Sequence, residues 1–254
     1  MTEHSSHADL QVERRLPKAE KIRLLLEASF VGGKSPRLLE IGTGSGVIAQ
    51  FFSAMGQCRV VHAVDVSDQR QVHGGYEFQL FDGHRLPFAD GEFDVVLSNH
   101  VIEHVGDRGE QARHLGEISR LLAPGGQAYL ASPSRWQVVE PHFRLPFLSW
   151  IPRRYRDGYV RIAGKGERYD CDPMGHEELE KLLTAHGLRF RNANVAALRA
   201  MALGQPDAGR MLRMAARLPS ALLQRFYRIS PTMIYVLEKP IAGLAAGTRV
   251  GAAT

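Results

Sequence analysis

Three glycines separated by single residues form the part of the sequence whose spacing points most directly to ligand chemistry. They are Gly42, Gly44 and Gly46. They follow a predicted apolar strand at 37–41 and precede a predicted helix from Val47. Glycine lets the backbone approach a ligand closely, and the start of a helix offers free N–H groups to that ligand. Asp65 ends the next predicted strand, at about the ~20-residue spacing at which a carboxylate meets a ribose hydroxyl. This order predicts a nucleoside-binding site.

Glu40 and the glycine spacing favour one kind of nucleoside over another. Dinucleotide sites use G-x-G-x-x-G around an anionic pyrophosphate, whereas this chain has G-x-G-x-G with a carboxylate two residues before it. S-adenosylmethionine carries an adenine and a ribose together with a cationic amine and a sulfonium, which a carboxylate attracts. We therefore expect S-adenosylmethionine rather than NAD, and we expect Thr43, Gly46 and Val66 among its contacts.

A second candidate contact is the pair Asp82 and Gly83, which follows a short predicted strand at 76–80. Ligands of open α/β sheets bind at the carboxyl ends of the parallel strands. At that position Asp82 can accept a hydrogen bond from an adenine amino group, and Gly83 gives the ring close access to the backbone. A simple Asp-Gly turn is the alternative, and the residues themselves leave both interpretations open.

Four motifs in a fixed order carry a resemblance to a known family. They are E-x-G-x-G-x-G at 40–46, D-G-x-x-L-P-F at 82–88, F-D-V-V-x-S-N-x-x-x-E-H at 93–104 and L-x-P-G-G at 122–126. Together with the acidic residue after the second strand, the set resembles class I S-adenosylmethionine-dependent methyltransferases of the methyltransferase type 11 kind. The specific motifs cover residues 36–133.

The resemblance implies that residues at the ends of the first four strands bind the methyl donor. They are Glu40, Gly42 and Gly44 for the methionine part, Asp65 for the ribose, Asp82 and Gly83 for the adenine, and the backbone of Asn99 for the methionine side. None of them needs to make or break a bond. The task of such a protein is to hold the acceptor in line with the methyl group.

Alternating strand and helix patterns predict an α/β fold. We expect a Rossmann-like sheet of seven mostly parallel strands, with helices on both faces and an antiparallel strand at the edge. Residues 17–240 form the predicted methyltransferase domain, and an amphipathic helix at 18–30 leads into it. Residues 1–16 and 241–254 are predicted to be disordered tails.

Two inserts depart from a minimal domain of this kind, and the first, residues 133–170, follows the fifth strand, where the acceptor is expected. Glu140 and His142 in this insert are the best candidates for a general base, because neutral imidazole takes up a proton near pH 7. His104, after the fourth strand, is a third catalytic candidate. The alternative for His142 is a packed or surface imidazole without a catalytic role.

Residues 100–104 spell H-x-x-E-H, which is a zinc-protease pattern in other proteins. That pattern needs a long helix and a third ligand, whereas Gly106 and Gly109 follow here within a few residues. Ubiquinone-pathway O-methyltransferases of the broad group carry E-x-x-E-H at this point, and this chain has histidine in place of the first glutamate. We therefore predict no metal ligands, expect no divalent metal, and interpret the segment as a wall of the cofactor pocket.

The second insert, residues 198–229, follows a predicted strand at 188–196 and mixes arginine with aromatic and aliphatic residues. Such helical segments suit an acceptor that carries phosphate or lies at a membrane surface, although most amphipathic helices cover their own core.

The run P-x-R…E-P-H…L-P-F-L-x-W-I-P at 133–152, in the first insert, is similar to methyltransferases of glycans or glycolipid precursors. We expect O-methylation of a sugar, a glycolipid or another small hydroxylated acceptor. The alternative is C- or N-methylation of a quinone-like or natural-product molecule, or of a nucleic acid.

Composition narrows the class of protein. The 254 residues are 44% hydrophobic and 23% charged, with a net charge of +5, which is typical of a globular chain. The basic residues are interleaved rather than clustered, so nucleic acid is not the expected partner. Cys58 and Cys171 are too few for a disulfide framework or a cysteine-based zinc site. No signal peptide or membrane span is recognisable, so the expected location is the cytoplasm, with peripheral membrane contact as a further option. No pattern indicates an oligomeric state.

Overall fold

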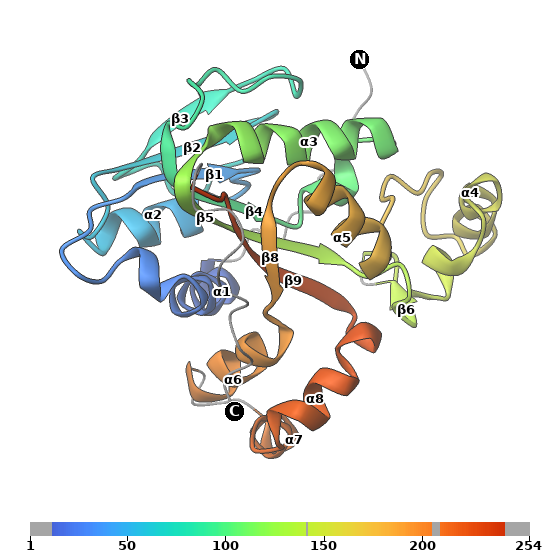
Figure 1. Ribbon diagram of the computed structural model, residues 1–254. Helices are drawn as coiled ribbons and strands as arrows, with labels where there is room; N and C mark the ends of the chain where they lie inside the picture. The colour runs from blue at the N-terminus through green and yellow to red at the C-terminus, as the bar shows by residue number, and fades with distance from the viewer. Residues whose placement is uncertain (1–11, 141, 205–208, 242–254) are drawn as a thin grey trace.

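The computed structural model describes residues 12–140, 142–204 and 209–241, and a seven-stranded sheet forms its centre. The strands are β1 (Arg37–Ile41), β2 (Val60–Asp65), β3 (Glu77–Leu80), β4 (Phe93–Asn99), β5 (Leu122–Pro133), β8 (Arg189–Asn192) and β9 (Thr232–Glu238). Their order is β3-β2-β1-β4-β5-β9-β8 (Figure 1). The first five are parallel, whereas β9 is antiparallel to both β5 and β8. The predicted fold class is confirmed, with the antiparallel pair at one edge.

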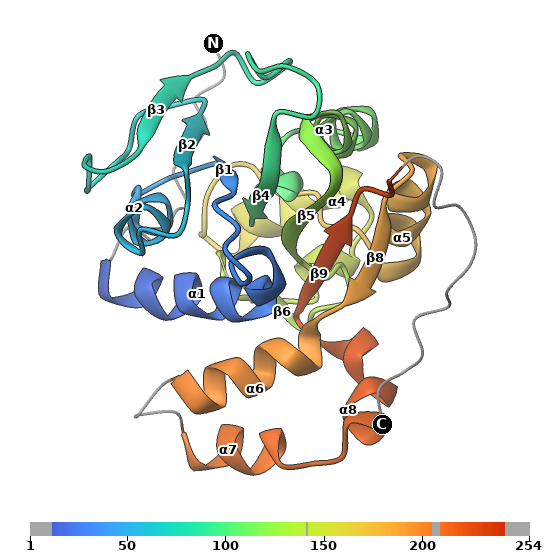
Figure 2. The same ribbon diagram turned by 60° about the vertical axis from the view of Figure 1, so that its left-hand side comes forward.

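Helices cover both faces of the sheet. One face carries α1 (Val12–Leu25), α2 (Val47–Ala54) and α6 (Asn194–Gly204), and the other carries α3 (Arg108–Leu121) and α5 (His176–Ala185), as Figure 1 and Figure 2 show. Leu38 of β1 packs into the first layer, whereas Leu39 and Ile41 pack into the second, because successive side chains of a strand point to opposite faces. Burial on both sides explains why the central strands are nearly continuous apolar runs.

Helix α1 begins earlier than the sequence predicts. It starts at Val12, inside the predicted disordered tail, rather than at Lys18. Pro17 therefore lies inside the helix, beyond its first turn, and has no N–H to donate to the Glu13 carbonyl. The physical reason is a tertiary one. Arg15 is buried, and its charge acts on Glu40 of β1, so the first turn is held against the sheet by a contact that periodicity does not show.

Strand β8 ends at Asn192, before the predicted end at 196, and α6 begins correspondingly early. The Asn192 side-chain oxygen accepts the Asn194 N–H at 3.0 Å, a local bond that competes with an extended strand. The Asn194 side-chain oxygen in turn accepts the Ile234 N–H of β9 at 3.0 Å. Two asparagines thus end the strand where the apolar pattern alone continues it.

The first insert contains a small hairpin, β6 (Val139–Glu140) and β7 (Leu145–Pro146), followed by α4 (Arg153–Ile162). The second insert consists of most of α6, α7 (Arg210–Ala216) and α8 (Ser220–Arg225), and it lies below α1 in Figure 2. Short 3-10 helices are η1 (Glu27–Ser29), η2 (Ile102–His104), η3 (Leu148–Trp150) and η4 (Tyr227–Ile229). Parts of the predicted tails and inserts lie outside the described residues, namely 1–11, 141, 205–208 and 242–254. None of the described helices has both the length and the apolar character needed to cross a membrane.

Candidate functional site

The loop between β1 and α2 has a backbone conformation that favours glycine at three positions. Gly42, Gly44 and Gly46 have φ values of 74°, 53° and 80°. A Cβ on Gly42 would collide with the Val101 side chain, and one on Gly46 would lie 2.5 Å from the Val72 carbonyl oxygen. Neither Gly42 nor Gly46 has space for a side chain, so the loop can adopt this tight turn only with glycine. This is consistent with the predicted nucleoside-binding loop.

Asp65, at the end of β2, is bonded directly to this glycine loop. Its Oδ2 accepts the Gly44 N–H at 2.9 Å, and its Oδ1 accepts the Val66 N–H at 2.7 Å. The N–H groups of Gly42 and Thr43 donate to one carbonyl of β2, at 2.9 and 3.2 Å. The predicted ribose-binding carboxylate and the predicted methionine-binding turn thus form one hydrogen-bonded unit.

Glu40 lies beneath the loop with 1% of its surface exposed. Burial raises the pKa of Glu40 to about 8, while a 2.9 Å hydrogen bond from the Thr43 hydroxyl and the charge of Arg15 oppose the rise. A cation bound nearby would lower this pKa, so the site suits a cationic group such as the amine of S-adenosylmethionine. The sequence alone does not point to Arg15, because no motif surrounds it. Only the folded structure brings Arg15 of α1 close enough to Glu40 of β1 for its charge to act there.

The ends of β2 and β3 bring Val66 and Gly83 together. An ideal Cβ on Gly83 would lie 3.5 Å from Cγ1 of Val66, which is van der Waals distance. The Asp82 carboxylate accepts a hydrogen bond from the His84 N–H at 3.0 Å. The alternative interpretation of these residues, an Asp-Gly turn, therefore has a hydrogen bond that supports it. Asn99 is the last residue of β4. The predicted donor-binding residues therefore all lie at the carboxyl ends of four neighbouring strands, and their binding role stays a prediction.

Glu140 and His142, the two predicted general-base residues, are bonded to each other. His142 Nδ1 is 2.8 Å from Glu140 Oε1, and the Phe143 N–H donates to Glu140 Oε2 at 2.7 Å. Glu140 is buried, with 1% of its surface exposed. The hydrogen bond to Glu140 raises the pKa of His142, and partial burial of the imidazole opposes that rise. The carboxylate fixes the orientation of the ring and favours its protonated form.

His104, the third catalytic candidate, lies beside Glu140 and His142. Its ring centroid is 5.6 Å from that of His142, with the ring planes nearly perpendicular. His104 ends η2, whose three residues are too short for the helix that an H-x-x-E-H zinc site needs. Within that motif, His100 Nδ1 is 3.1 Å from Glu103 Oε1 instead. The segment after β4 and the insert after β5 therefore meet through their histidines.

A segment that sequence reasoning did not select, residues 170–172, completes this cluster. Cys171 Sγ lies 3.6 Å from His104 Nδ1 and 3.8 Å from His142 Nδ1. Asp172 anchors the segment, because its carboxylate oxygens lie 2.9 Å from Arg156 Nη1 and 3.2 Å from Arg108 Nη1. No signal in the sequence joins position 171 to positions 104 and 142, since more than twenty residues separate them and no motif spans them.

The sheet order, the glycine loop and Asp65 define a class I S-adenosylmethionine-dependent methyltransferase fold. The sequence model of the methyltransferase-domain family matches residues 11–197, and the chain belongs to that family.

Known proteins with different acceptors resemble this chain. The ubiquinone biosynthesis O-methyltransferase of Parvibaculum lavamentivorans is 29% identical over 136 residues, which are 48% of this chain and 51% of the relative. The dimethylglycine N-methyltransferase of Parasynechococcus marenigrum is 31% identical over 165 residues, 61% of this chain and 58% of the relative. The crystal structure of a Methanosarcina mazei S-adenosylmethionine-dependent methyltransferase shares the fold, with a TM-score of 0.51 at 18% identity over 85% of this chain and 97% of that one. The chain spans about half the length of the curated relatives that it matches.

Proposed function

We propose that this protein transfers a methyl group from S-adenosylmethionine to a hydroxyl oxygen of a small acceptor. The observation that carries the proposal is the 2.8 Å pair of Glu140 and His142 in the insert after β5. Through the ring contact of His142 with His104, this insert meets the segment that follows Asn99 and β4. A half-buried imidazole held by a carboxylate therefore lies next to the segment that continues a predicted donor-binding strand, which supports its use as a base.

The donor side needs no bond chemistry from the protein. When bound, S-adenosylmethionine supplies a methyl group on a sulfonium, which is already a good leaving group. Glu40 offers a buried carboxylate to the cationic amine, and Asp65 offers oxygen acceptors to the ribose hydroxyls. At Gly42 and Gly46 a Cβ would meet the Val101 side chain and the Val72 carbonyl, so only glycine lets the loop turn this tightly beside the donor. The protein then has to align the two reactants and keep water away.

The acceptor side needs a base, because an alcohol becomes a good nucleophile only as its proton leaves. Neutral His142 takes that proton on Nε2, since Nδ1 is bonded to Glu140, and Glu140 stabilises the imidazolium that forms. A neutral amine attacks through its lone pair and needs no base beforehand, so the pair favours oxygen over nitrogen. The alternative remains a C- or N-methyltransferase of a quinone-like or natural-product molecule, which the similarity to dimethylglycine N-methyltransferase supports.

Exposed aromatic rings beside arginines make the first insert suited to a sugar or glycolipid acceptor. The ring centroids of Trp136 and Trp150 are 5.9 Å apart, and that of Phe147 is 5.0 Å from Trp150. The Arg135 guanidinium carbon lies 5.6 Å from the Trp136 ring centroid. Flat apolar faces of this kind accept the C–H face of a sugar ring, and guanidinium groups bind phosphate.

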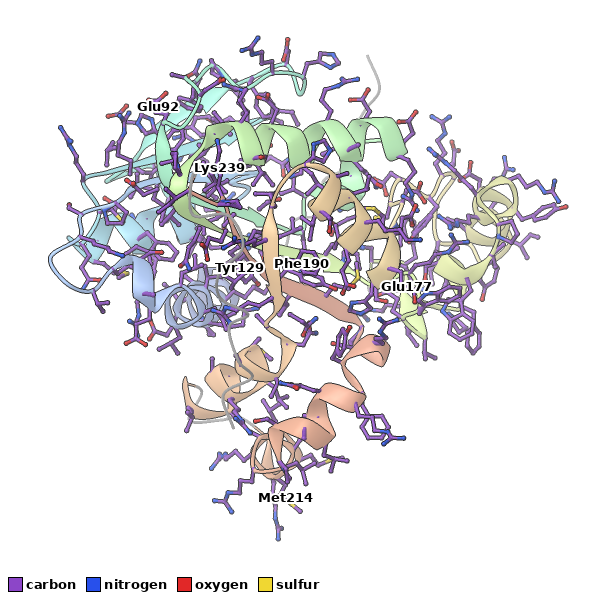
Figure 3. The ribbon with its side chains drawn as sticks, in the orientation of Figure 1. Glu92, Tyr129, Glu177, Phe190, Met214 and Lys239 are labelled. Atoms are coloured by element: carbon purple, nitrogen blue, oxygen red, sulfur yellow. The ribbon has the colours of Figure 1, made fainter. Side chains whose placement is uncertain are left out.

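The second insert has the character of a membrane-contacting surface. Met211 and Met214 of α7 are 85% and 63% exposed, and Met214 points away from the sheet in Figure 3. Six arginines surround them in sequence: Arg199, Arg210, Arg213, Arg217, Arg225 and Arg228. Exposed apolar side chains among arginines bind an anionic lipid surface through both burial and charge. A membrane-held glycolipid acceptor would bring the two inserts into use together, at a cytoplasmic membrane surface.

Calorimetry and an acceptor screen test the proposed reaction. We expect S-adenosylmethionine and S-adenosylhomocysteine to bind in preference to NAD, and a labelled methyl group to reach hydroxyl oxygens of sugar-containing acceptors. His142→Ala should lower kcat about 100-fold or more with little change in donor affinity. His186→Ala, beyond the far end of α5, is the matched control and should keep full activity. Preferential NAD binding, label on nitrogen or carbon, or full turnover in His142→Ala would contradict the proposal.

Vesicle flotation tests the membrane surface separately. We expect the protein to float with vesicles that contain anionic lipid, to float less with neutral vesicles, and to be released by salt. The double variant Met211→Ser/Met214→Ser should float much less. Val31→Ser removes a side chain that is 53% exposed between α1 and β1, outside both inserts, and is the matched control. Equal flotation of wild type and the double variant would remove α7 from the proposed surface.

A further inference from the structure

Cys171 lies in two overlapping groups of side chains that can bind metals. The ligand atoms of His104, Asp170 and Cys171 all lie within 4.8 Å of one another, and so do those of Glu140, His142 and Cys171. Cys171 is 2% exposed, so the two groups meet inside the protein. They come from three separate places in the chain: η2, the β6–β7 hairpin and the segment after α4.

The distances around the Cys171 sulfur match those of a tetrahedral zinc ion. Zinc lies ~2.3 Å from sulfur and ~2.0–2.2 Å from nitrogen or oxygen, so two ligand atoms at a tetrahedral angle are about 3.6 Å apart. Cys171 Sγ is 3.6 Å from His104 Nδ1 and 3.8 Å from Asp170 Oδ1. Only small side-chain shifts would separate this arrangement from zinc coordination.

The charges around Cys171 favour a cation at this point. Burial and the carboxylates of Asp170, Glu103 and Glu140 all raise the pKa of the Cys171 thiol, because they disfavour a second negative charge. Glu103 is buried, and its Oε2 has no hydrogen-bond partner within the described part of the chain. An unpaired buried carboxylate oxygen is costly, and a nearby dication would offset that cost and also stabilise the thiolate.

The group around Glu140 is less suited to the ion, because its atoms are already engaged. Glu140 uses Oε1 for His142 Nδ1 and Oε2 for the Phe143 N–H. His142 Nδ1 also faces Cys171 Sγ at 3.8 Å, so one nitrogen cannot both hold Glu140 and take the thiol proton. This geometry, together with the raised pKa of the thiol, argues against a Cys-His-Glu nucleophile.

We propose that His104, Asp170 and Cys171 bind one divalent ion of the zinc class, with a fourth position open to water or an acceptor oxygen. Imidazole, carboxylate and thiolate together suit zinc, and three protein ligands with an open position are typical of catalytic rather than structural zinc sites. The thiolate and one carboxylate neutralise the two charges of the ion. The expectation of no metal rests on the motif at 100–104 alone, which lacks a long helix and has histidine in place of the first glutamate; Asp170 and Cys171 lie outside that motif.

Cobalt spectroscopy on the full chain tests this site without any measurement of methyl transfer. Protein stripped with a chelator is titrated with Co²⁺ and then with Zn²⁺. We expect one ion per chain, a thiolate-to-cobalt charge-transfer band in the near ultraviolet, and loss of that band when zinc displaces cobalt. Cys171→Ser should abolish the band and weaken zinc binding at least about 10-fold, whereas Cys58→Ser, the matched cysteine variant, should keep both. Asp170→Asn should weaken zinc binding, and His142→Ala should keep it.

Thermal unfolding shows whether each variant is folded, so that loss of zinc binding can be told apart from loss of structure. Zinc should raise the Tm of wild type and of Cys58→Ser, and it should leave the Tm of Cys171→Ser unchanged. Competition between stripped wild type and a fluorescent zinc chelator gives the affinity without any variant. The proposal is wrong if wild type shows no charge-transfer band and no micromolar zinc binding, if the band persists in Cys171→Ser, or if His142→Ala removes it. None of these outcomes depends on the acceptor or on donor binding.

Discussion

The Thr43 hydroxyl donates a hydrogen bond of 2.9 Å to the Glu40 carboxylate, beneath the glycine loop and out of contact with water. The two residues lie three positions apart, at the end of β1 and in the loop that follows. Burial of this carboxylate raises its pKa to about 8, so near neutral pH the unliganded protein holds Glu40 largely protonated. A cationic ligand would restore the charge. In the proposed donor site, Glu40 would therefore link ligand binding to the stability of the free protein.

Glu40→Gln should stabilise the free protein and weaken its binding of S-adenosylmethionine. A carboxyl group whose folded pKa lies above its unfolded value contributes stability below the unfolded pKa, and the protein loses that stability as pH rises through about 8. The glutamine oxygen keeps the Thr43 bond and cannot ionise. We expect the Tm of the variant to exceed that of wild type by a margin that grows from pH 6.5 to pH 9. A constant margin across this range, measured by calorimetry, would mean that Glu40 does not titrate there.

Glu140→Gln should move the acid limb of the pH–rate profile to lower pH and lower the plateau. The proposed base is neutral His142, and the bond from Glu140 raises the pKa of that imidazole. Wild-type activity should therefore rise as pH passes through this raised value. The neutral glutamine removes the charge that raises it. Protonated His142 also contributes to the free energy of unfolding. This contribution is present below the unfolded pKa of the imidazole and is lost as pH rises through its folded pKa. Glu140→Gln should lack this contribution. An unchanged acid limb in kcat/KM against pH would assign the limb to another group.

Gly46→Ala should unfold more easily and bind the donor more weakly. A non-glycine residue at positive φ costs about 1–3 kcal/mol, and here the new methyl group also meets the Val72 carbonyl oxygen at 2.5 Å. Gly33→Ala is the matched control, because Gly33 has a φ of 75° and nothing within 4 Å of the added Cβ. Urea unfolding of both variants separates strain from steric conflict. Equal losses of stability would show that the loop accommodates the methyl group.

Asp172→Ala should destabilise the first insert and the 170–172 segment together. Asp172 pairs with Arg156, which is buried, and with Arg108 at the start of α3. Removing Asp172 leaves the buried Arg156 guanidinium without a negatively charged partner, which costs about 3–5 kcal/mol. Asp68→Ala breaks an exposed pair with Arg70 and is the control, with little change in stability expected. Chemical denaturation gives both values, and a similar small loss for the two variants would show that Arg156 finds another partner.

Much of the fold, and the geometry of the proposed donor site, could be predicted from local sequence. The strands at 37–41 and 93–98 were predictable because apolar runs of that length must be buried on both faces of a parallel sheet. The glycine loop and Asp65 were predictable because the chain needs particular residues where a strand turns into a helix. The early start of α1 at Val12 was not, since a contact made from Arg15 to a distant strand extends that helix.

The sequence by itself determined the sheet, the glycine loop and the identity of Glu140 and His142 as base candidates, because each depends on residues close together in the chain. Only the tertiary structure decided that these two side chains bond to each other and that His104 lies beside them. It alone brought Cys171 and Asp170 to the same cluster. The segment after β4, the β6–β7 hairpin and the segment after α4 converge there. The packing of the whole domain sets their separation, which no local pattern records.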